Sequence, residues 1–266
     1  VISLVGSEMC IRDSNSNGSN GQMFEDEKWN GDVVDKEYAE FRMRNEPLVE
    51  VTQVKGTSET HPLLSPNDEW ANFEIFPSRI GQNIYSIQYG GYVRDAYLRG
   101  MLAEWEGKGN PYKFGLVGAS DTHTAASSYD ESNYWSKVGL LDGETFLRGS
   151  TTLAKEDIDQ ITSSVNTQGL YRFVEQDEEY FLDTFYSRWG ASGIAAVWAE
   201  ENTRESIFAG FRRKETYATS GTRIKLRFFG GFGLDDLDLS DEEIISMAYE
   251  KGVSMGGDLA YNSVEK

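Results

Sequence analysis

The sequence of 266 residues contains little cysteine and little histidine. The single cysteine, Cys10, excludes an intramolecular disulfide framework and a cysteine-rich zinc site. Because His61 and His123 are the two histidines of the chain, any chemistry that needs an imidazole must use one or both of them. A chain without disulfides suits the periplasm as well as the cytoplasm, so the sequence leaves the localisation unknown.

Long hydrophobic runs and basic charge are also scarce. The longest apolar stretch, residues 193–199, is far shorter than the ~20 residues that a membrane span requires. The chain has 25 basic and 44 acidic side chains and a net charge of −19, which argues against nucleic acid or an anionic membrane surface as the main partner. With 39% hydrophobic residues the composition is nevertheless globular. We expect a soluble protein with a small-molecule partner, and its oligomeric state stays open.

The first fourteen residues, VISLVGSEMCIRDS, differ in character from the rest of the chain. They lack the basic segment and the cleavage site of a signal peptide. The string resembles a translated sequencing adapter, an artefact of assembled environmental DNA. We therefore expect residues 1–14 to be non-native, with an ordinary N-terminal strand as the alternative, and we treat the chain as a fragment of a longer protein.

The pattern from residue 35 to about residue 220 predicts helices that alternate with short strands, which is typical of α/β architecture. Helices are expected at residues 35–44 and 92–105, and strands at residues 48–54, 114–119 and 194–198. A further helix is expected to be capped by Asn202, with Glu205 three residues later. Residues 223–229 alternate charged and bulky side chains, which predicts an antiparallel strand. This change of pattern near Gly221 indicates a domain boundary.

Asp121 and His123 follow the predicted strand at residues 114–119 and lie two residues apart. The period of two in a strand places both side chains on one face, where a carboxylate oxygen and an imidazole nitrogen can bind one metal ion. The carboxyl ends of parallel strands are also where α/β folds place their sites. The alternative is that Asp121 caps a helix and that His123 lies in a loop.

A second polar cluster, KGTSETH at residues 55–61, follows the predicted strand at residues 48–54. Glu59 and His61 are again two residues apart and are candidate metal ligands. Lys55 is a candidate for binding an anionic substrate. The alternative is a plain turn at His61 and a solvated Lys55. No nucleophile elbow, phosphate-binding glycine loop or zinc-protease helix is present, and no catalytic residue is singled out.

Five segments in order together resemble the domain of unknown function 3604 family, from Asn15 onward. They are NSNGSNGQMF (15–24), EPLVEVTQVKGTSETHP (46–62), GLVGASDTHT (115–124), WGASGIAAVWAEENTRESIF (189–208) and YATSGTRI (217–224). That family is similar to the PHP (polymerase and histidinol phosphatase) superfamily of metal-dependent hydrolases. The resemblance implies a distorted β/α barrel with metal ligands at the carboxyl ends of its strands, and its final ligand motif, Asp-x-His, falls on Asp121 and His123.

The chain also departs from the superfamily pattern. The chain has neither the early His-x-His motif nor the later histidine pair of that superfamily. The resemblance also implies a histidine, in some relatives, at the position of Lys55. The fragment therefore holds at most part of a multinuclear metal site. We expect residues 15–221 to form the C-terminal part of a PHP-like β/α barrel and residues 222–266 to begin a truncated, β-rich region.

The leading functional hypothesis is a metal-dependent, phosphoesterase-like hydrolase in the full-length parent. Divalent zinc, manganese or iron would activate a water and stabilise the charge that develops on the substrate. The alternative is a non-catalytic binding or structural module on a degenerate PHP-like barrel, because an ammonium at Lys55 disfavours a nearby metal cation. A hydrolase that cleaves a sulfate ester or an amide is a third possibility.

Overall fold

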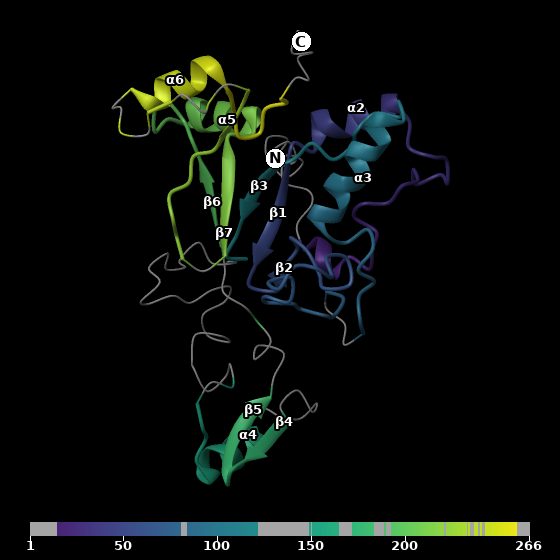
Figure 1. Ribbon diagram of the computed structural model, residues 1–266. Helices are drawn as coiled ribbons and strands as arrows, with labels where there is room; N and C mark the ends of the chain where they lie inside the picture. The colour runs from purple at the N-terminus through teal and green to yellow at the C-terminus, as the bar shows by residue number, and fades with distance from the viewer. Residues whose placement is uncertain are drawn as a thin grey trace.

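The computed structural model describes residues 15–80, 84–121, 149, 151–164, 172–183, 189, 193–220, 222–232, 234, 237–238, 240 and 243–259. In these residues the protein is a mixed α/β structure with one three-stranded and three two-stranded sheets, and no barrel is closed (Figure 1). The expected α/β class is confirmed, whereas the described strands form separate small sheets and do not show the expected partial barrel. Residues 1–14, Gly221 and His123 lie outside the described residues.

Helix α2 (Lys36–Asn45) follows a short 3₁₀ turn, η1 (Ser16–Gly18), and begins and ends one residue later than the predicted helix at residues 35–44. The side chain of Asp35 accepts a hydrogen bond from the backbone N–H of Tyr38 at 2.8 Å, which satisfies one free donor of the first turn. Arg42 and Arg44 lie in the last turn, where cations interact favourably with the helix dipole.

The strands of the central sheet run in the order β2-β1-β3. Strand β1 (Leu48–Gln53) pairs in parallel with β3 (Gly115–Gly118) and antiparallel with β2 (Gly56–Thr57). Thr52 faces Thr57 and Gln53 faces Gly56, so a turn of two residues, Val54 and Lys55, reverses the chain. Gly56 has φ 89°, which favours glycine, and all of β1 is buried.

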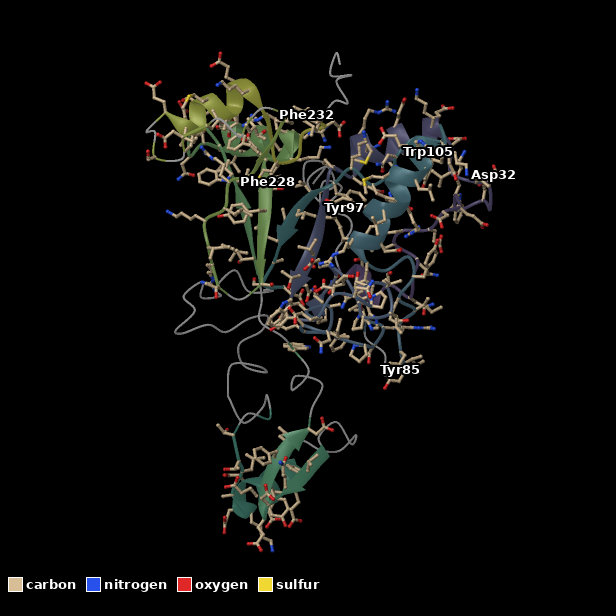
Figure 2. The ribbon with its side chains drawn as sticks, in the orientation of Figure 1. Asp32, Tyr85, Tyr97, Trp105, Phe228 and Phe232 are labelled. Carbon is tan, nitrogen blue, oxygen red and sulfur yellow. The ribbon has the colours of Figure 1, made fainter. Side chains whose placement is uncertain are left out.

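The hydrophobic core lies between this sheet and helix α3 (Val93–Trp105). Its buried members are Phe24, Val49, Val51, Val93, Ala96, Tyr112 and Phe114. Burial of each large apolar side chain stabilises the fold by roughly 1.5–3 kcal/mol. The outer side of α3 is not covered in the same way, because Leu98, Met101 and Leu102 are exposed. Trp105, the last residue of the helix, is also exposed (Figure 2).

A second pair of strands packs closely against β3. Strands β6 (Gly193–Val197) and β7 (Thr216–Ser220) are antiparallel, and α5 (Arg204–Arg213) connects them. A Cβ at Gly193 would lie 2.0 Å from the carbonyl oxygen of Thr219, so this contact requires glycine. The cap of α5 is Thr203, which accepts from the Ser206 N–H at 3.3 Å, and the prediction of Asn202 is wrong by one residue.

The remaining elements form two smaller groups. Helix α4 (Lys155–Ser164) lies with the hairpin of β4 (Arg172–Gln176) and β5 (Glu179–Asp183). Strands β8 (Phe229–Gly230) and β9 (Val253–Ser254) pair beside α6 (Ile244–Lys251). No helix in the described ranges has the length and apolar character needed to cross a membrane.

The predicted strand at residues 223–229 is wrong except at its last residue. Residues 223–228 have no strand assignment. The indole N–H of Trp198 donates to the carbonyl oxygen of Leu226 at 2.8 Å, and the guanidinium of Arg227 lies 3.7 Å from the Trp198 ring centre. Contacts with Trp198 therefore hold this segment.

Candidate functional site

Polar side chains meet at the carboxyl ends of the parallel strands β1 and β3. We call them the strand-end cluster, and its members are Asn15, Glu50, Gln53, Lys55 and Asp121. Lys55 and Asp121 are predicted site residues that the structure brings together. Glu50 lies on β1 and Gln53 is the last residue of that strand. Asn15 precedes η1 and is hydrogen-bonded to both Glu50 and Gln53.

Lys55 and Asp121 form a buried ion pair. The ammonium of Lys55 donates to Oδ2 of Asp121, and the side chains are 6% and 16% exposed. The alternative of a solvated Lys55 is wrong. The two-residue turn holds this residue at the end of β1, where it is buried. Removing one partner of such a pair leaves an uncompensated buried charge, which is strongly destabilising.

Glu50 is the second carboxylate of the cluster. Burial, and to a smaller extent the nearby charge of Asp121, raise the pKa of Glu50 to about 7. The ammonium of Lys55 and the backbone N–H of Asn15, which donates to Oε1 of Glu50 at 3.4 Å, act in the opposite direction. Glu50 can therefore gain or lose a proton near neutral pH, as a general acid or base must.

The backbone around the cluster is held in unusual conformations. Asn15 has φ 53° and Asp121 has φ 58°, a region that asparagine and aspartate enter more readily than other residues with a side chain. The side-chain amide of Gln53 donates to Oδ1 of Asn15. Asn17 extends this network, because its amide donates to the carbonyl oxygen of Lys55 at 3.0 Å. The N-terminal loop is thereby fixed on the turn.

No sequence pattern indicated that Asn15 or Gln53 is a site residue, and Glu50 was offered only as a possible further ligand outside the final set of candidates. One available signal was the Asn- and Gly-rich composition of residues 15–21, which suits left-handed backbone next to a buried strand. The other was the position of Glu50 on the strand that leads to Lys55.

Glu59 belongs to a different group of charges. Its carboxylate accepts from the Nη2 of Arg94, and the carboxylate of Asp68 accepts from the Nη1 of Arg94 at 2.5 Å. We call Glu59, Asp68 and Arg94 the Arg94 group, and its side chains are 56%, 26% and 40% exposed. The backbone N–H of Arg94 donates to the carbonyl oxygen of Glu59, which ties this residue to the start of α3.

The imidazole ring of His61 is half-buried and contacts two neighbouring residues. Its Nδ1 accepts from the backbone N–H of Leu63 at 3.1 Å, and its ring lies 5.5 Å from that of Tyr92. Burial lowers the pKa of His61, which favours the neutral imidazole. The roles of Glu59, His61 and His123 as metal ligands stay predictions. Among the described residues, no group of three or more His, Cys, Asp or Glu side chains could hold a metal ion.

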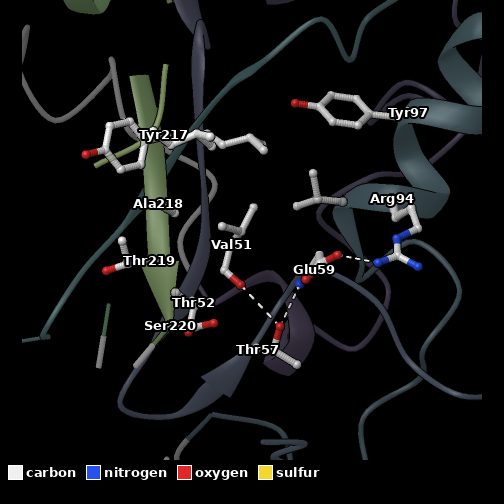
Figure 3. Close-up of a pocket in the computed structure, with 13 residues that line it drawn as sticks. Val51, Thr52, Thr57, Glu59, Arg94, Tyr97, Tyr217, Ala218, Thr219 and Ser220 are labelled. Carbon is white, nitrogen blue, oxygen red and sulfur yellow. Dashed lines mark hydrogen bonds and ion pairs between the residues drawn. The ribbon is translucent and has the colours of Figure 1, made fainter. Parts of the chain in front are cut away.

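A pocket of about 320 Å³ lies between α3 and strands β1, β3 and β7 (Figure 3). Its walls are mainly apolar and include Val51, Tyr97, Leu116 and Ala218. The ion pair of Glu59 and Arg94 lies on one side of it, opposite β7. This space can accept the apolar part of a small molecule.

Comparison with known proteins places the chain in one family. The profile described as "Protein of unknown function (DUF3604)" matches residues 4–266. The chain belongs to the DUF3604 family. This confirms the family to which the five sequence segments pointed. The DUF3604 match includes residues 4–14, so it gives no support to the adapter interpretation, and it carries no link to the PHP superfamily. No curated protein and no solved structure matches the chain.

Proposed function

We propose that this DUF3604 chain contributes part of a hydrolytic site for a small anionic substrate, most simply a phosphoester, at the strand-end cluster. The observation that carries the proposal is the convergence of Glu50, Lys55 and Asp121 at the carboxyl ends of β1 and β3. Sites of α/β proteins lie at this edge of a parallel sheet. In this proposal the small sheets belong to a larger, PHP-like barrel in the parent protein.

The cluster residues suit three roles. The ammonium of Lys55 can bind an anionic oxygen of the substrate, and Asp121 holds that ammonium in position. Glu50, with a pKa of about 7, can accept a proton from the attacking water. The oxygen of that water bonds to phosphorus as the bond to the leaving group breaks, and the leaving oxygen takes up a proton from solvent water. Glu50 later returns the proton that it accepted to solvent.

The resemblance to metal-dependent hydrolases implies a divalent zinc, manganese or iron ion at this place. The described residues do not by themselves fit such an ion. They offer two carboxylates, Glu50 and Asp121, and the ammonium of Lys55 already contacts Asp121. We therefore assign no step to a metal, and ligation by Asp121 and His123 together stays a hypothesis for the parent protein.

Activity measurements test the proposal. We expect the chain to hydrolyse p-nitrophenyl phosphate near pH 7, and Glu50→Gln to lower kcat by about 10²-fold or more, the usual effect of losing a general acid or base. Glu37→Gln, at an exposed position on α2, is the matched control and should change nothing.

Assays with and without added Mn²⁺ or Zn²⁺ show whether turnover depends on a metal, and assays with sulfate-ester and amide substrates show which bond is cleaved. Turnover that is unchanged in the double variant Asp121→Ala, His123→Ala would refute the assignment of the site.

The second candidate is the non-catalytic binding module. It is favoured by the pairing of two predicted ligands, Asp121 and Glu59, with basic side chains. Calorimetric titration with inorganic phosphate separates the two functions. Binding that Lys55→Met abolishes, in a chain without turnover, would support the module.

A further inference from the structure

We propose that the ammonium of Lys55 is the resident cation of the strand-end cluster, and that it keeps divalent metal ions away from Asp121. The inference concerns the same site as the proposed hydrolysis and states what holds that site together. It is tested by metal binding and stability rather than by turnover, so each proposal can fail while the other stands.

The first argument is the contact itself. Lys55 is 6% exposed at its side chain and its Nζ bonds to Oδ2 of Asp121. A metal ion that approached this oxygen would meet a positive charge within hydrogen-bond distance of the same atom. A divalent ion could bind only after the lysine side chain had moved away.

The second argument is that the backbone of Lys55 is fixed on both sides. Its N–H donates to Oε1 of Gln53 at 2.6 Å, and its carbonyl oxygen accepts from the amide of Asn17 at 3.0 Å. Asn17 is in turn held by Ser58, whose hydroxyl donates to Oδ1 of Asn17 at 2.9 Å. The ammonium therefore extends from a turn that buried polar side chains hold in place.

The third argument is the balance of charge. With Glu50 and Asp121 ionised, the ammonium of Lys55 compensates one of two negative charges in a largely buried place. Without the positive charge of Lys55, neither carboxylate would be compensated by residue 55. A divalent cation with carboxylate and amide oxygen ligands would then restore neutrality, and Asn15 and Gln53 supply amide groups nearby.

The experiment compares melting temperatures in EDTA and in millimolar MnCl₂. We expect the unchanged chain to melt within about 1 °C of the same temperature in both. Lys55→Met should melt about 5–10 °C lower in EDTA and recover most of this loss with Mn²⁺, and calorimetry should show Mn²⁺ binding that the unchanged chain lacks.

The matched control is Lys28→Met. Lys28 pairs with Asp35 at 2.5 Å, but this carboxylate is 57% exposed, so its loss should shift the melting temperature by no more than about 2–3 °C and create no response to Mn²⁺. The double variant Lys55→Met, Asp121→Asn removes both charges of the buried pair. Even if Lys55→Met does not fold, this double variant should fold, and its melting temperature should not change with Mn²⁺.

Two results would overturn the inference. In the first, Mn²⁺ raises the melting temperature of the unchanged chain by several degrees, and Asp121→Asn abolishes this rise. The metal would then bind at Asp121 with the lysine present. The other is a folded Lys55→Met variant with no gain in Mn²⁺ binding, because the lysine would then not be what excludes the metal.

Discussion

Two regions of the molecule each place a basic side chain between carboxylates, and they differ in burial. In the strand-end cluster, Lys55 contacts Asp121 beside Glu50, and the ion pair is largely hidden from solvent. In the Arg94 group, the guanidinium binds Glu59 and Asp68 at the surface. Because water screens the second group, its charges can be changed at little cost, whereas each charge of the first depends on its partner.

This contrast shows which acidic residues are suited to chemistry. The pKa of Glu50 is moved to about 7 by burial on β1. Asp68, at the surface, has its pKa lowered by the hydrogen bond from Arg94 and stays ionised. A carboxylate that changes its charge near neutral pH occurs in the buried region, so we place the candidate site there.

The largest expected effect comes from breaking the buried pair. Asp121→Asn should lower the free energy of unfolding by about 3–4 kcal/mol, because it leaves the ammonium of Lys55 buried without its carboxylate. Asparagine tolerates the left-handed conformation of position 121, so the substitution removes the charge without backbone strain. Urea unfolding measures the change, and an effect below 1 kcal/mol would show that the pair behaves like a surface pair.

The next effect is a dependence of stability on pH that arises from Glu50. The pKa of this carboxyl is raised from its ordinary value of 4.5 to about 7 in the folded chain. Its contribution to stability is therefore complete below pH 4.5 and is lost as the pH rises through 7, in total about 3 kcal/mol.

Glu50→Gln should remove this contribution, so that its urea unfolding changes less between pH 5 and pH 8 than that of the unchanged chain. Equal slopes in the two proteins would show that Glu50 titrates normally. Glu37→Gln, on the surface of α2, is the control and should keep the original slope.

The smallest effect is expected in the Arg94 group. Glu59→Gln should cost less than about 1 kcal/mol, and this cost should shrink further in high salt, because the pair is exposed and screened. Urea unfolding at low and high salt measures it. A cost as large as that of Asp121→Asn would remove the distinction between the two regions.

Local patterns predicted much of the fold. Helix α3 begins one residue after its predicted start, and β1 ends one residue before its predicted end, because apolar spacing and the flanking turn residues define both elements. The pairing of β6 with β7 depends on glycine contacts between distant segments, such as Gly193 with Thr219, and no local pattern encodes them. The error at residues 223–228 has the same origin, since Trp198 lies 28 positions from Leu226.

The candidate site was predicted in part. The predicted strand at residues 114–119 put Asp121 just beyond β3, but it said nothing about the ammonium that meets Asp121. The placement of Asp121 and His123 on one face stays a prediction, because His123 lies outside the described residues. Glu59 and His61 were grouped with Lys55 because they follow the same strand. The chain reverses at Val54 and Lys55, however, so the residues after β2 continue to the start of α3, where Arg94 binds Glu59. A turn of this kind is not visible in alternating hydrophobicity alone.

The shortness of the turn between β1 and β2 has a consequence for how the family can vary. Thr52 is matched to Thr57 and Gln53 to Gly56, which leaves two positions for the whole reversal. An inserted or deleted residue there would shift the pairing and aim a different side chain at Asp121. We therefore expect relatives to differ here by substitutions and not by insertions or deletions. A relative with a turn of another length is expected to lack this arrangement of charges.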